Sequence, residues 1–377
     1  MQLITFSEPL SVNFGRSTGD YEVHFQAQAP YIIGNANFRQ LCDSKEAKEN
    51  LFKVSTYDYR VPNFHAAAAK PGEPVLFYDG AGGFGDQVMA WPAAHILHRL
   101  GFAVHVLTSI GLEPCWWHFP WVKSICALPI LQGQLEMWRH LAFMEAVVNC
   151  DEHPDQLHPV DTMLRKFGID PATIDPALKV ITPVFTPGER QRALALRPQG
   201  RFGVYQLATT SPTRSMSPDQ AISTLNALAT QHRNVSWLVI YDRFVPEATV
   251  ARAKAIRLPN VAVRTFNSIR VIWAIVATAD VCVGPDSMLI HIAGSMGTPT
   301  VGLWGPMRPS SRVKYYRNHI PIWHQSSCQF APCFKVAREF PRYCPPMPEP
   351  RQVCAVLGDI SGEEVCDAVA KALFCLQ

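Results

Sequence analysis

The sequence predicts an α/β protein with two similar domains, preceded by a short β-rich segment. Two series of alternating strand-like and helix-like runs support this, one beginning at Val75 and one near Arg201. Such alternation is typical of parallel sheets with helices on both faces. A chain of 377 residues, 48% of them hydrophobic and 17% charged, is large and apolar enough for two folded domains. We therefore expect two α/β domains that face each other across a cleft.

Composition excludes several classes of protein. The net charge is only +3 and the basic residues are scattered, so we expect no nucleic-acid partner. No run approaches 18 apolar residues, and the first residues lack the pattern of a secretory signal, so we expect no membrane span and no export. The 11 cysteines are odd in number, which disfavours a disulfide scaffold and indicates the reducing cytoplasm.

The first 70 residues form the expected β-rich segment. Apolar and polar residues alternate in ITFSEPLSVNF and YEVHFQAQAPYII, which predicts short strands, and a helix is expected near residues 44–53. The run AAAAKPGEP then resembles a linker. We expect a first domain over residues 71–197, a second over 198–354, and a C-terminal helix over 355–377.

The first α/β series opens with a glycine-rich turn. Its sequence GAGGFG, from Gly80 to Gly85, fits the pattern of a dinucleotide-binding turn and is followed at once by Asp86. The helix after it is expected to end at Gly101, with its proper start near Pro92, where proline is tolerated. A dinucleotide site also requires an acid at the end of the second strand, but the first acid there is Glu113. NAD binding at this turn is therefore an alternative that lacks the acidic residue expected to bind the ribose.

The second series is more regular. Strands are expected at FGVYQLA, WLVIY, VAVRTF, DVCVG and PTVGLW, and helices over residues 218–231, 246–257, 269–279 and 287–296. The region between the two series, residues 110–195, is rich in Trp, Pro and Cys and gives no clear pattern.

Three motifs resemble glycosyltransferase family 9, the heptosyltransferases. In residues 279–306, ADVCVGPDSMLIHIAGSMGTPTVGLWGP, an aspartate (Asp286) ends a strand, His291 follows on a helix, and G-x-P and aromatic-Gly-Pro turns come after. Residues 85–93 are similar to the family's Gly-Asp…Pro-Ala element. The loop LATTSPTRSMS is similar to its A-T-T…Lys loop and has Arg214 in place of the phosphate-binding lysine.

The resemblance implies a GT-B fold, with two Rossmann-like domains and the active site between them. It also implies inverting transfer of a sugar from a nucleotide diphosphate, most often ADP-heptose, without a catalytic metal. Such a displacement requires one base near the acceptor and positive charge near the leaving phosphates. Asp86 suits the base, with Gly83 and Gly85 as the turn near the substrate. The donor-binding candidates are Thr210, Arg214, Asp286, Ser287, Met288, His291 and, at the nucleoside ribose, Glu247.

Each of these assignments has a structural alternative. Asp86 and Asp286 are each also suited to be a helix cap, and His291 to be a hydrogen-bonded core histidine. Glu247 is equally compatible with an exposed helix end. Met288 departs from the family's usual glycine, and Met307-Arg308 departs from its Thr-Asp, which puts the heptose donor in doubt.

Six of the 11 cysteines lie in the last 50 residues. Cys328, Cys333, Cys344 and Cys354 are spaced C-x4-C-x10-C-x9-C, and four thiolates in one loop-rich segment are able to hold a structural zinc or iron. Some relatives, the autotransporter heptosyltransferases, are similar in having an iron-holding cysteine finger here and an extra N-terminal β domain. The alternative is four reduced cysteines in a packed loop, or one adventitious disulfide.

The sequence leaves the partners open. The cluster CWWHFPW contains Trp116 and Trp117, which favour core packing over sugar stacking. The expected partners are a nucleotide-sugar donor and a glycan or protein acceptor, and the N-terminal segment is compatible with a protein acceptor or a homo-oligomer contact. A non-catalytic binding protein of the same fold and an NAD-dependent oxidoreductase are the alternatives.

Overall fold

The computed structural model describes residues 1–16, 19–57, 63–80, 83–144, 156–242, 245–333 and 353–374. The chain divides into two compact units, one made of residues 1–152 and 159–184 and the other of residues 153–158 and 185–377. None of the described helices is long and apolar enough to cross a membrane.

The β-rich segment belongs to the first unit. Its strands are β1 (Gln2–Phe6), β4 (Tyr31–Ile33) and β5 (Leu51–Thr56), joined by β9 (Ile130–Leu131) in an antiparallel sheet of order β5-β1-β4-β9. A hairpin of β2 (Leu10–Arg16) and β3 (Gly19–Phe25) and the helices α1 (Asn35–Asp43) and α2 (Lys45–Asn50) complete it. The expected strands are thus confirmed.

The helix expected over residues 44–53 is partly wrong. The chain leaves α2 after Asn50, and the run LFKVST pairs with β1 instead, with Ile4 opposite Val54. Its alternating, partly β-branched residues suit a strand better than a helix. The two-residue strand β9 lies far along the chain from this segment and had no sequence signal.

A parallel sheet forms the centre of the first unit. Its strands are β6 (Pro74–Asp79), β7 (Ala103–Ser109), β8 (Ile125–Leu128) and β10 (Leu141–Met144), in the order β10-β6-β7-β8. The helix α3 (Phe84–Arg99) contacts both β6 and β7, and α5 (Pro159–Lys166) packs on α3. The shorter elements in the unclear region are α4 (Gln132–Glu136) and the 3-10 turns Glu113–Cys115, Pro171–Thr173 and Pro176–Lys179.

The helix α3 begins earlier than expected. It starts at Phe84 and carries Pro92 in its interior, so the expected start near Pro92 is wrong. Every residue from Gln87 to Ala94 is buried, and this packing stabilises the helix despite the missing proline N–H. The expected end is confirmed: Gly101 has a φ of +95°, and the N–H of Phe102 donates to the carbonyl of Leu97 (3.1 Å), as in a Schellman motif.

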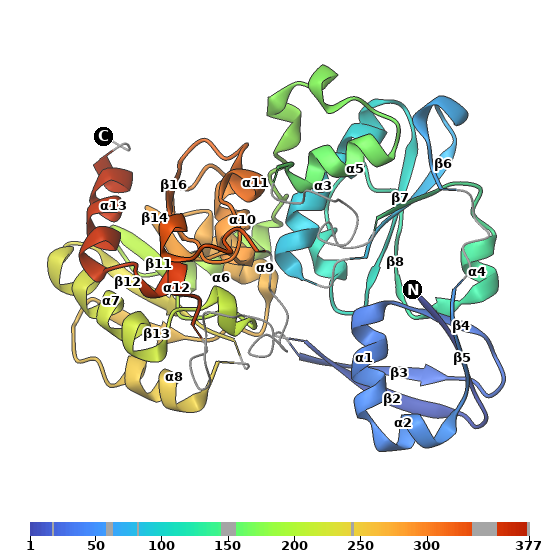
Figure 1. The fold of residues 1–377 in the computed structure, drawn as a ribbon, viewed down its shortest axis with the longest axis horizontal. Coiled ribbons are helices and arrows are strands. Elements are labelled where there is room, and N and C mark those ends of the chain that lie inside the picture. The colour runs from blue at the N-terminus through green and yellow to red at the C-terminus, as the bar shows by residue number, and fades with distance from the viewer. Residues whose placement is uncertain are drawn as a thin grey trace. The chain divides into compact units, whose positions relative to one another are not determined.

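The second unit is a six-stranded parallel sheet with helices on both faces (Figure 1). Its order is β13-β12-β11-β14-β15-β16, with β11 (Phe202–Gln206), β12 (Ser236–Ile240), β13 (Val261–Arg264), β14 (Val281–Pro285), β15 (Thr300–Leu303) and β16 (His319–Ile322). The first five strands confirm the expectation, and β16 is an addition. This is the 3-2-1-4-5-6 order of a Rossmann sheet.

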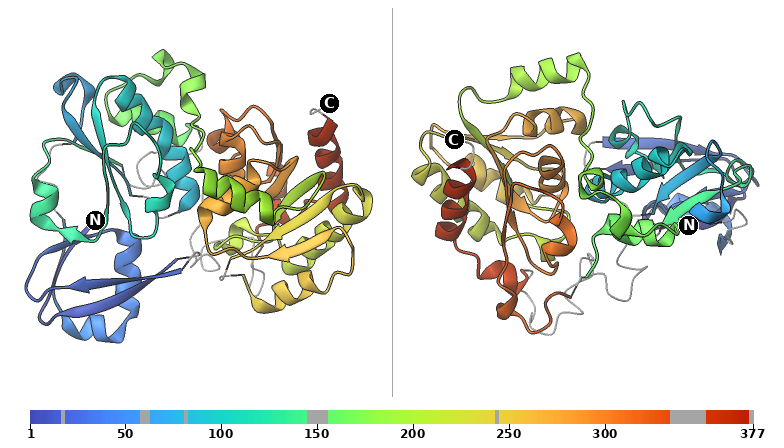
Figure 2. Two further views of the ribbon diagram at one scale, coloured as in Figure 1. Left: turned by 180° about the vertical axis from the view of Figure 1, so that it is seen from behind. Right: turned by 90° about the horizontal axis from the view of Figure 1, so that it is seen from above.

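The helices of this unit divide between the faces (Figure 2). One layer contains α7 (Pro218–Gln231), α8 (Glu247–Lys254) and α13 (Gly362–Phe374), and the other contains α6 (Pro187–Leu196), α9 (Ile269–Val276) and α10 (Met288–Ser295). The short α11 (Ser310–Val313) and α12 (Ala355–Gly358) complete the set. Four of these confirm predicted helices, with α7 matching residue for residue.

The boundary between the units differs from the one expected after residue 197. The structure places α6 in the second unit because α6 packs against α9. There the buried guanidinium of Arg270 pairs with Glu189 at 2.9 Å, and Glu189 also completes a capping box with Thr186. The residues expected as a C-terminal helix begin with α12 and continue as α13.

Candidate functional site

The topology of the second unit indicates where a ligand would bind. From β11 the chain runs outward to β12 and β13 and then returns to β14 on the opposite side of β11. In open α/β sheets, ligands bind outside the carboxyl ends of the strands at such a switch point. Here these ends are Gln206 of β11 and Pro285 of β14.

Arg214 and Asp286 meet at this switch point. The guanidinium Nη1 of Arg214 donates to the backbone carbonyl of Asp286 (2.8 Å) and lies 3.8 Å from its carboxylate Oδ2. The Arg214 side chain is a quarter exposed, while its Nε is buried and has no hydrogen-bond partner among the described residues. Arg214 is therefore held by Asp286 with N–H groups left for an anion.

Asp286 is not a helix cap. The N-cap of α10 is Ser287, and Asp286 lies before it, buried, with its Oδ1 3.2 Å from Nε2 of His291. Burial alone would raise the pKa of Asp286, but the His291 hydrogen bond and the positive charge of Arg214 hold it well below its ordinary value. The carboxylate is ionised and fully used in holding its neighbours.

His291 matches the core-histidine alternative. It is 1% exposed, and besides Asp286 it contacts the hydroxyl of Tyr316, 3.3 Å from its Nδ1. Because an ionised carboxylate only accepts hydrogen bonds, Nε2 of His291 is the donor to Asp286. His291 therefore orients Asp286 and has no surface of its own to offer a ligand.

Ser287 is held by a residue that the sequence analysis did not single out. Its hydroxyl donates to Oε1 of Gln206 (2.6 Å), whose Nε2 donates in turn to the carbonyl of Ala208 (3.0 Å). Gly284 leaves room for this contact, because a Cβ there would lie 3.0 Å from Cβ of Gln206. The available signal was a polar residue at the end of an apolar strand.

The loop after β11 is ordered by its own hydroxyl groups. Thr209 Oγ1 donates to the carbonyl of Ser211 (2.8 Å) and lies 3.1 Å from Oγ of Ser215, which also donates to that carbonyl (3.0 Å). Thr210 is exposed, and no bond to it is seen among the described residues. Thr209 therefore shapes the loop, whereas Thr210 faces solvent.

Met288 turns its side chain toward the core. It is the first residue of α10, half-buried, and its Sδ accepts a hydrogen bond from the buried indole N–H of Trp273 (2.9 Å). The first N–H groups of a helix have no acceptor within the helix and point outward. The thioether is thus anchored to α9, and the role of Met288 at the donor stays a prediction.

Glu247 is exposed at the first position of α8, on the chain segment that follows the carboxyl end of β12. The position suits a contact with a ribose, but among the described residues no hydrogen bond or ion pair orients its side chain. Its role stays a prediction.

Asp86 is the third residue of α3 and not its N-cap, which is Gly83. The carboxylate folds back over this glycine: a Cβ on Gly83 would lie only 2.7 Å from Oδ2 of Asp86. Gly85 is the second helical residue. Asp86 is half-buried and forms no side-chain hydrogen bond with another described residue, so its carboxylate remains available.

The aromatic cluster after β7 divides between core and surface. Trp116 is 1% exposed, and its indole N–H donates to Oε1 of Gln87 (2.8 Å), whereas Trp117 is 44% exposed. The expected core packing holds for Trp116, and Trp117 retains a face open to solvent.

The cysteine prediction is only partly within the described residues. Cys328, Cys333 and Cys354 form no disulfide with another described residue, and Cys344 lies outside the described residues. Burial raises the pKa of Cys354 to about 11, and a metal ligand has to be deprotonated. Within the described ranges, no three His, Cys, Asp or Glu side chains are arranged to hold a metal ion, so these three thiols alone do not fit one. The N–H of Cys333 donates to the carbonyl of Pro306 (3.1 Å), which attaches this segment to the Trp-Gly-Pro turn.

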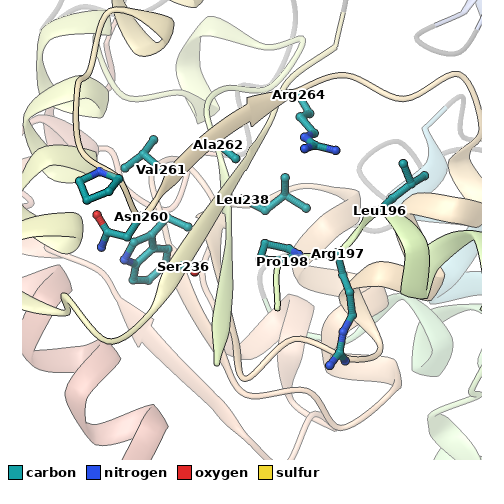
Figure 3. Close-up of a pocket in the computed structure, with 11 residues that line it drawn as sticks. Leu196, Arg197, Pro198, Ser236, Leu238, Asn260, Val261, Ala262 and Arg264 are labelled. Atoms are coloured by element: carbon teal, nitrogen blue, oxygen red, sulfur yellow. The ribbon is translucent and has the colours of Figure 1, made fainter. Parts of the chain in front are cut away.

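A pocket of the second unit lies apart from these residues (Figure 3). It is lined by Leu196 and Pro198 beside the end of α6 and by Leu238 and Ala262 of β12 and β13, with Arg264 at its rim. None of the predicted site residues lines it, so it is not part of the candidate donor site.

Residues 245–343 match the model of glycosyltransferase family 9 (heptosyltransferase). No curated protein sequence matches the chain. The fold is similar to that of a glycosyl transferase family 9 protein from Veillonella parvula (TM-score 0.60, 13% identity, 80% of this chain and 97% of that one).

Two structures from E. coli are also similar. One is ADP-heptose lps heptosyltransferase II (TM-score 0.56, 12% identity, 80% of this chain and 99% of that one). The other is the dodecameric iron-containing heptosyltransferase TibC in complex with ADP-D-beta-D-heptose (TM-score 0.55, 10% identity). The TibC match covers 100% of this chain and 96% of that one, so it includes the β-rich segment. At these identities the likeness establishes the fold, a two-domain Rossmann-like GT-B architecture.

Proposed function

The chain carries the glycosyltransferase family 9 signature in its second unit and has the GT-B fold, and from this premise we propose that it is an inverting heptosyltransferase. It would move a heptose from a nucleotide diphosphate, ADP-heptose being the first candidate, to an acceptor hydroxyl. The observation that carries the proposal is the anchored Arg214 at the switch point, with its buried Nε lacking an acceptor among the described residues.

The donor diphosphate binds, in this proposal, at the start of α10. Arg214 supplies a positive charge that cannot be titrated away, and the helix N-terminus supplies N–H groups and the favourable end of the helix dipole. Ser287 adds a hydroxyl by exchanging its bond to Gln206 for one to a phosphate oxygen. Asp286 and His291 support Arg214 from behind and do not touch the donor.

Asp86 is the proposed base. The acceptor oxygen attacks the anomeric carbon and forms the new glycosidic bond, while the bond from that carbon to the phosphate oxygen breaks. The hydroxyl proton passes to Asp86, and the electron pair of the broken bond leaves with the nucleotide diphosphate, whose charge Arg214 offsets. The proposed scheme uses no catalytic metal, because in it Arg214 and the helix N-terminus offset the developing charge.

For the acceptor and the oligomeric state we propose only a class. The acceptor is a glycan or a protein hydroxyl, with the exposed Trp117 as a stacking surface for a sugar. Glu247 is proposed to contact the ribose. A homo-oligomer is proposed on the likeness to dodecameric TibC, and a structural iron or zinc at the four cysteines remains a proposal that includes Cys344. The described cysteines form no disulfide with one another, and we propose a reducing compartment, the cytoplasm, as the location of the protein.

The test is ligand binding followed by turnover. A ligand that binds only the folded protein raises its melting temperature, so the protein is heated with ADP, ADP-heptose, UDP and NAD in turn. We expect shifts with ADP and ADP-heptose that disappear in Arg214→Ala. Turnover is then measured as the ADP formed from ADP-heptose in the presence of glycan or serine-rich peptide acceptors. Asp86→Asn should bind ADP as wild type does but form no ADP from ADP-heptose. A shift with NAD alone would instead favour an oxidoreductase, and no shift at all would favour a non-catalytic protein.

A further inference from the structure

Beside Asp86 lies a buried amide that joins four parts of the first unit. Gln87 is 1% exposed; its Oε1 accepts hydrogen bonds from Nε1 of Trp116 (2.8 Å) and Oγ1 of Thr108 (3.3 Å). Its Nε2 donates to Oδ2 of Asp79 (3.4 Å). Asp79 ends β6, Thr108 lies near the end of β7, and Trp116 follows the next 3-10 turn, and all three are buried. One side chain thus anchors the start of α3 to the carboxyl edge of the sheet.

The same residue closes the first turn of the helix. The backbone N–H of Gln87 donates to the carbonyl of Gly83 (3.2 Å), the earliest such bond of α3. Gly83 has no side chain with which to cap the helix. The turn that carries Asp86 is therefore fixed at one end by the backbone of Gln87 and against the sheet by its side chain.

Asp86 itself takes no part in this anchoring. Its carboxylate is half-buried, lies over the Cα of Gly83, and forms no side-chain hydrogen bond with another described residue. The backbone of the first turn of α3 therefore determines where the Cβ of Asp86 lies and how far its carboxylate reaches. Displacing a reacting group by about 1 Å is able to cost about a hundredfold in rate.

We propose that Gln87 is the positioning residue of the base: its side-chain hydrogen bonds to Asp79, Thr108 and Trp116 hold the first turn of α3 so that Asp86 faces the acceptor hydroxyl. This inference rests on the proposed function, since it assigns Gln87 a role through Asp86. The competing explanation is that Gln87 only satisfies buried polar groups and contributes to stability. The two explanations predict different turnover: only a positioning role predicts that a Gln87 variant loses more kcat than a control variant with the same loss of stability.

The test removes the bonds singly and together. Gln87→Met keeps the length of the side chain and removes all three bonds, Trp116→Phe removes the 2.8 Å bond, and Thr108→Val removes the 3.3 Å bond. The matched control is Asn260→Ala in the second unit, whose amide donates to the carbonyls of Ala229 (3.0 Å) and Val235 (3.1 Å) and whose loss lowers stability away from Asp86. Each variant is measured for melting temperature, ADP affinity, and kcat and KM of ADP release from ADP-heptose.

We expect Gln87→Met to lower kcat by about tenfold to a hundredfold, with ADP affinity and the KM for ADP-heptose unchanged. Trp116→Phe should lower kcat less, and Asn260→Ala should lower the melting temperature only. A Gln87→Met protein that turns over like wild type while Asp86→Asn is inactive would overturn the inference and leave the proposed function standing. If wild type and Asp86→Asn release ADP equally slowly, both are overturned. If Gln87→Met does not fold, the kcat values of Trp116→Phe and Thr108→Val are compared with that of Asn260→Ala instead.

Discussion

Acidification should destabilise the second unit through one half-buried histidine, His319. His319 begins β16, and its Nε2 accepts a hydrogen bond from the indole N–H of Trp304 (3.2 Å), while its Nδ1 lies 2.6 Å from the hydroxyl of Thr300. Since an indole N–H only donates, Nε2 must be unprotonated. Burial, with a smaller contribution from His291, lowers the pKa of His319 to about 3, so the imidazole is neutral in the folded protein.

The size and sign of the effect follow from this shift. In the unfolded chain a histidine has a pKa of about 6.5, so between the two values the unfolded state binds a proton that the folded state does not. The contribution of His319 to stability is fully present above pH 6.5 and is lost as the pH falls toward 3. At about 1.4 kcal/mol for each pH unit, lowering the pH to 5 costs about 2 kcal/mol of unfolding free energy.

The measurement is urea unfolding followed by tryptophan fluorescence at pH 7.5 and 5.0. His319→Gln retains an acceptor for Trp304 but does not titrate, so its stability should fall between these pH values by about 2 kcal/mol less than that of wild type. All other titrating groups are common to both proteins and cancel in the difference. Equal pH dependence in the two proteins would show that His319 is not held neutral, and the account of this histidine would be refuted.

Three further outcomes are expected. Gly83→Ala adds a Cβ that would lie only 2.7 Å from Oδ2 of Asp86, so the carboxylate has to move. The kcat of ADP release should fall by about tenfold, with little change in ADP affinity. Unchanged turnover would show that Asp86 does not react in the orientation seen here. Met288→Gly removes the thioether that accepts from Trp273 and adds glycine to a helix, so the melting temperature should fall while ADP still binds, and a loss of ADP binding would contradict the assignment of Met288 as an anchor. Protein purified without chelator should contain about one iron or zinc ion per chain that is lost when the four cysteines are replaced by serine, and a metal content well below one would contradict the structural metal.

The second unit was predictable because several local signals agree there. Ser217 caps α7 by accepting from the N–H of Gln220 (3.1 Å), Pro218 follows at the first helical position, and the apolar spacing continues to Gln231. Across residues 110–195 such agreement exists only at the start of α6, where Thr186, Pro187 and Glu189 form a capping box that the sequence analysis missed. The rest of the region has none. Its elements are short, and β9 owes its conformation to pairing with β4, about a hundred residues earlier in the chain. Conformation set by distant partners leaves little trace in the local sequence.

The candidate site divides in a similar way. Arg214, Asp286 and Ser287 belong to motifs with recognisable spacing, and the structure brings these three together. Gln206 and Gln87 were missed, because a single amide in an apolar run has no spacing partner that would mark it. Thr209 was also missed, because the direction in which a side chain of this loop points depends on how the loop folds.

The two aspartates at helix starts differ in ways that suit the different roles proposed for them. Asp286 is buried, bonded to His291 and paired with Arg214, so its pKa lies well below its ordinary value. A carboxylate stabilised as an anion in this way is a poor acceptor of a proton. Asp86 has no such partner among the described residues, and the neighbouring Gln87 anchors the helix with an amide that does not titrate. The Gln87 amide does not itself titrate, so it is able to fix the position of the proposed base without adding a charge of its own.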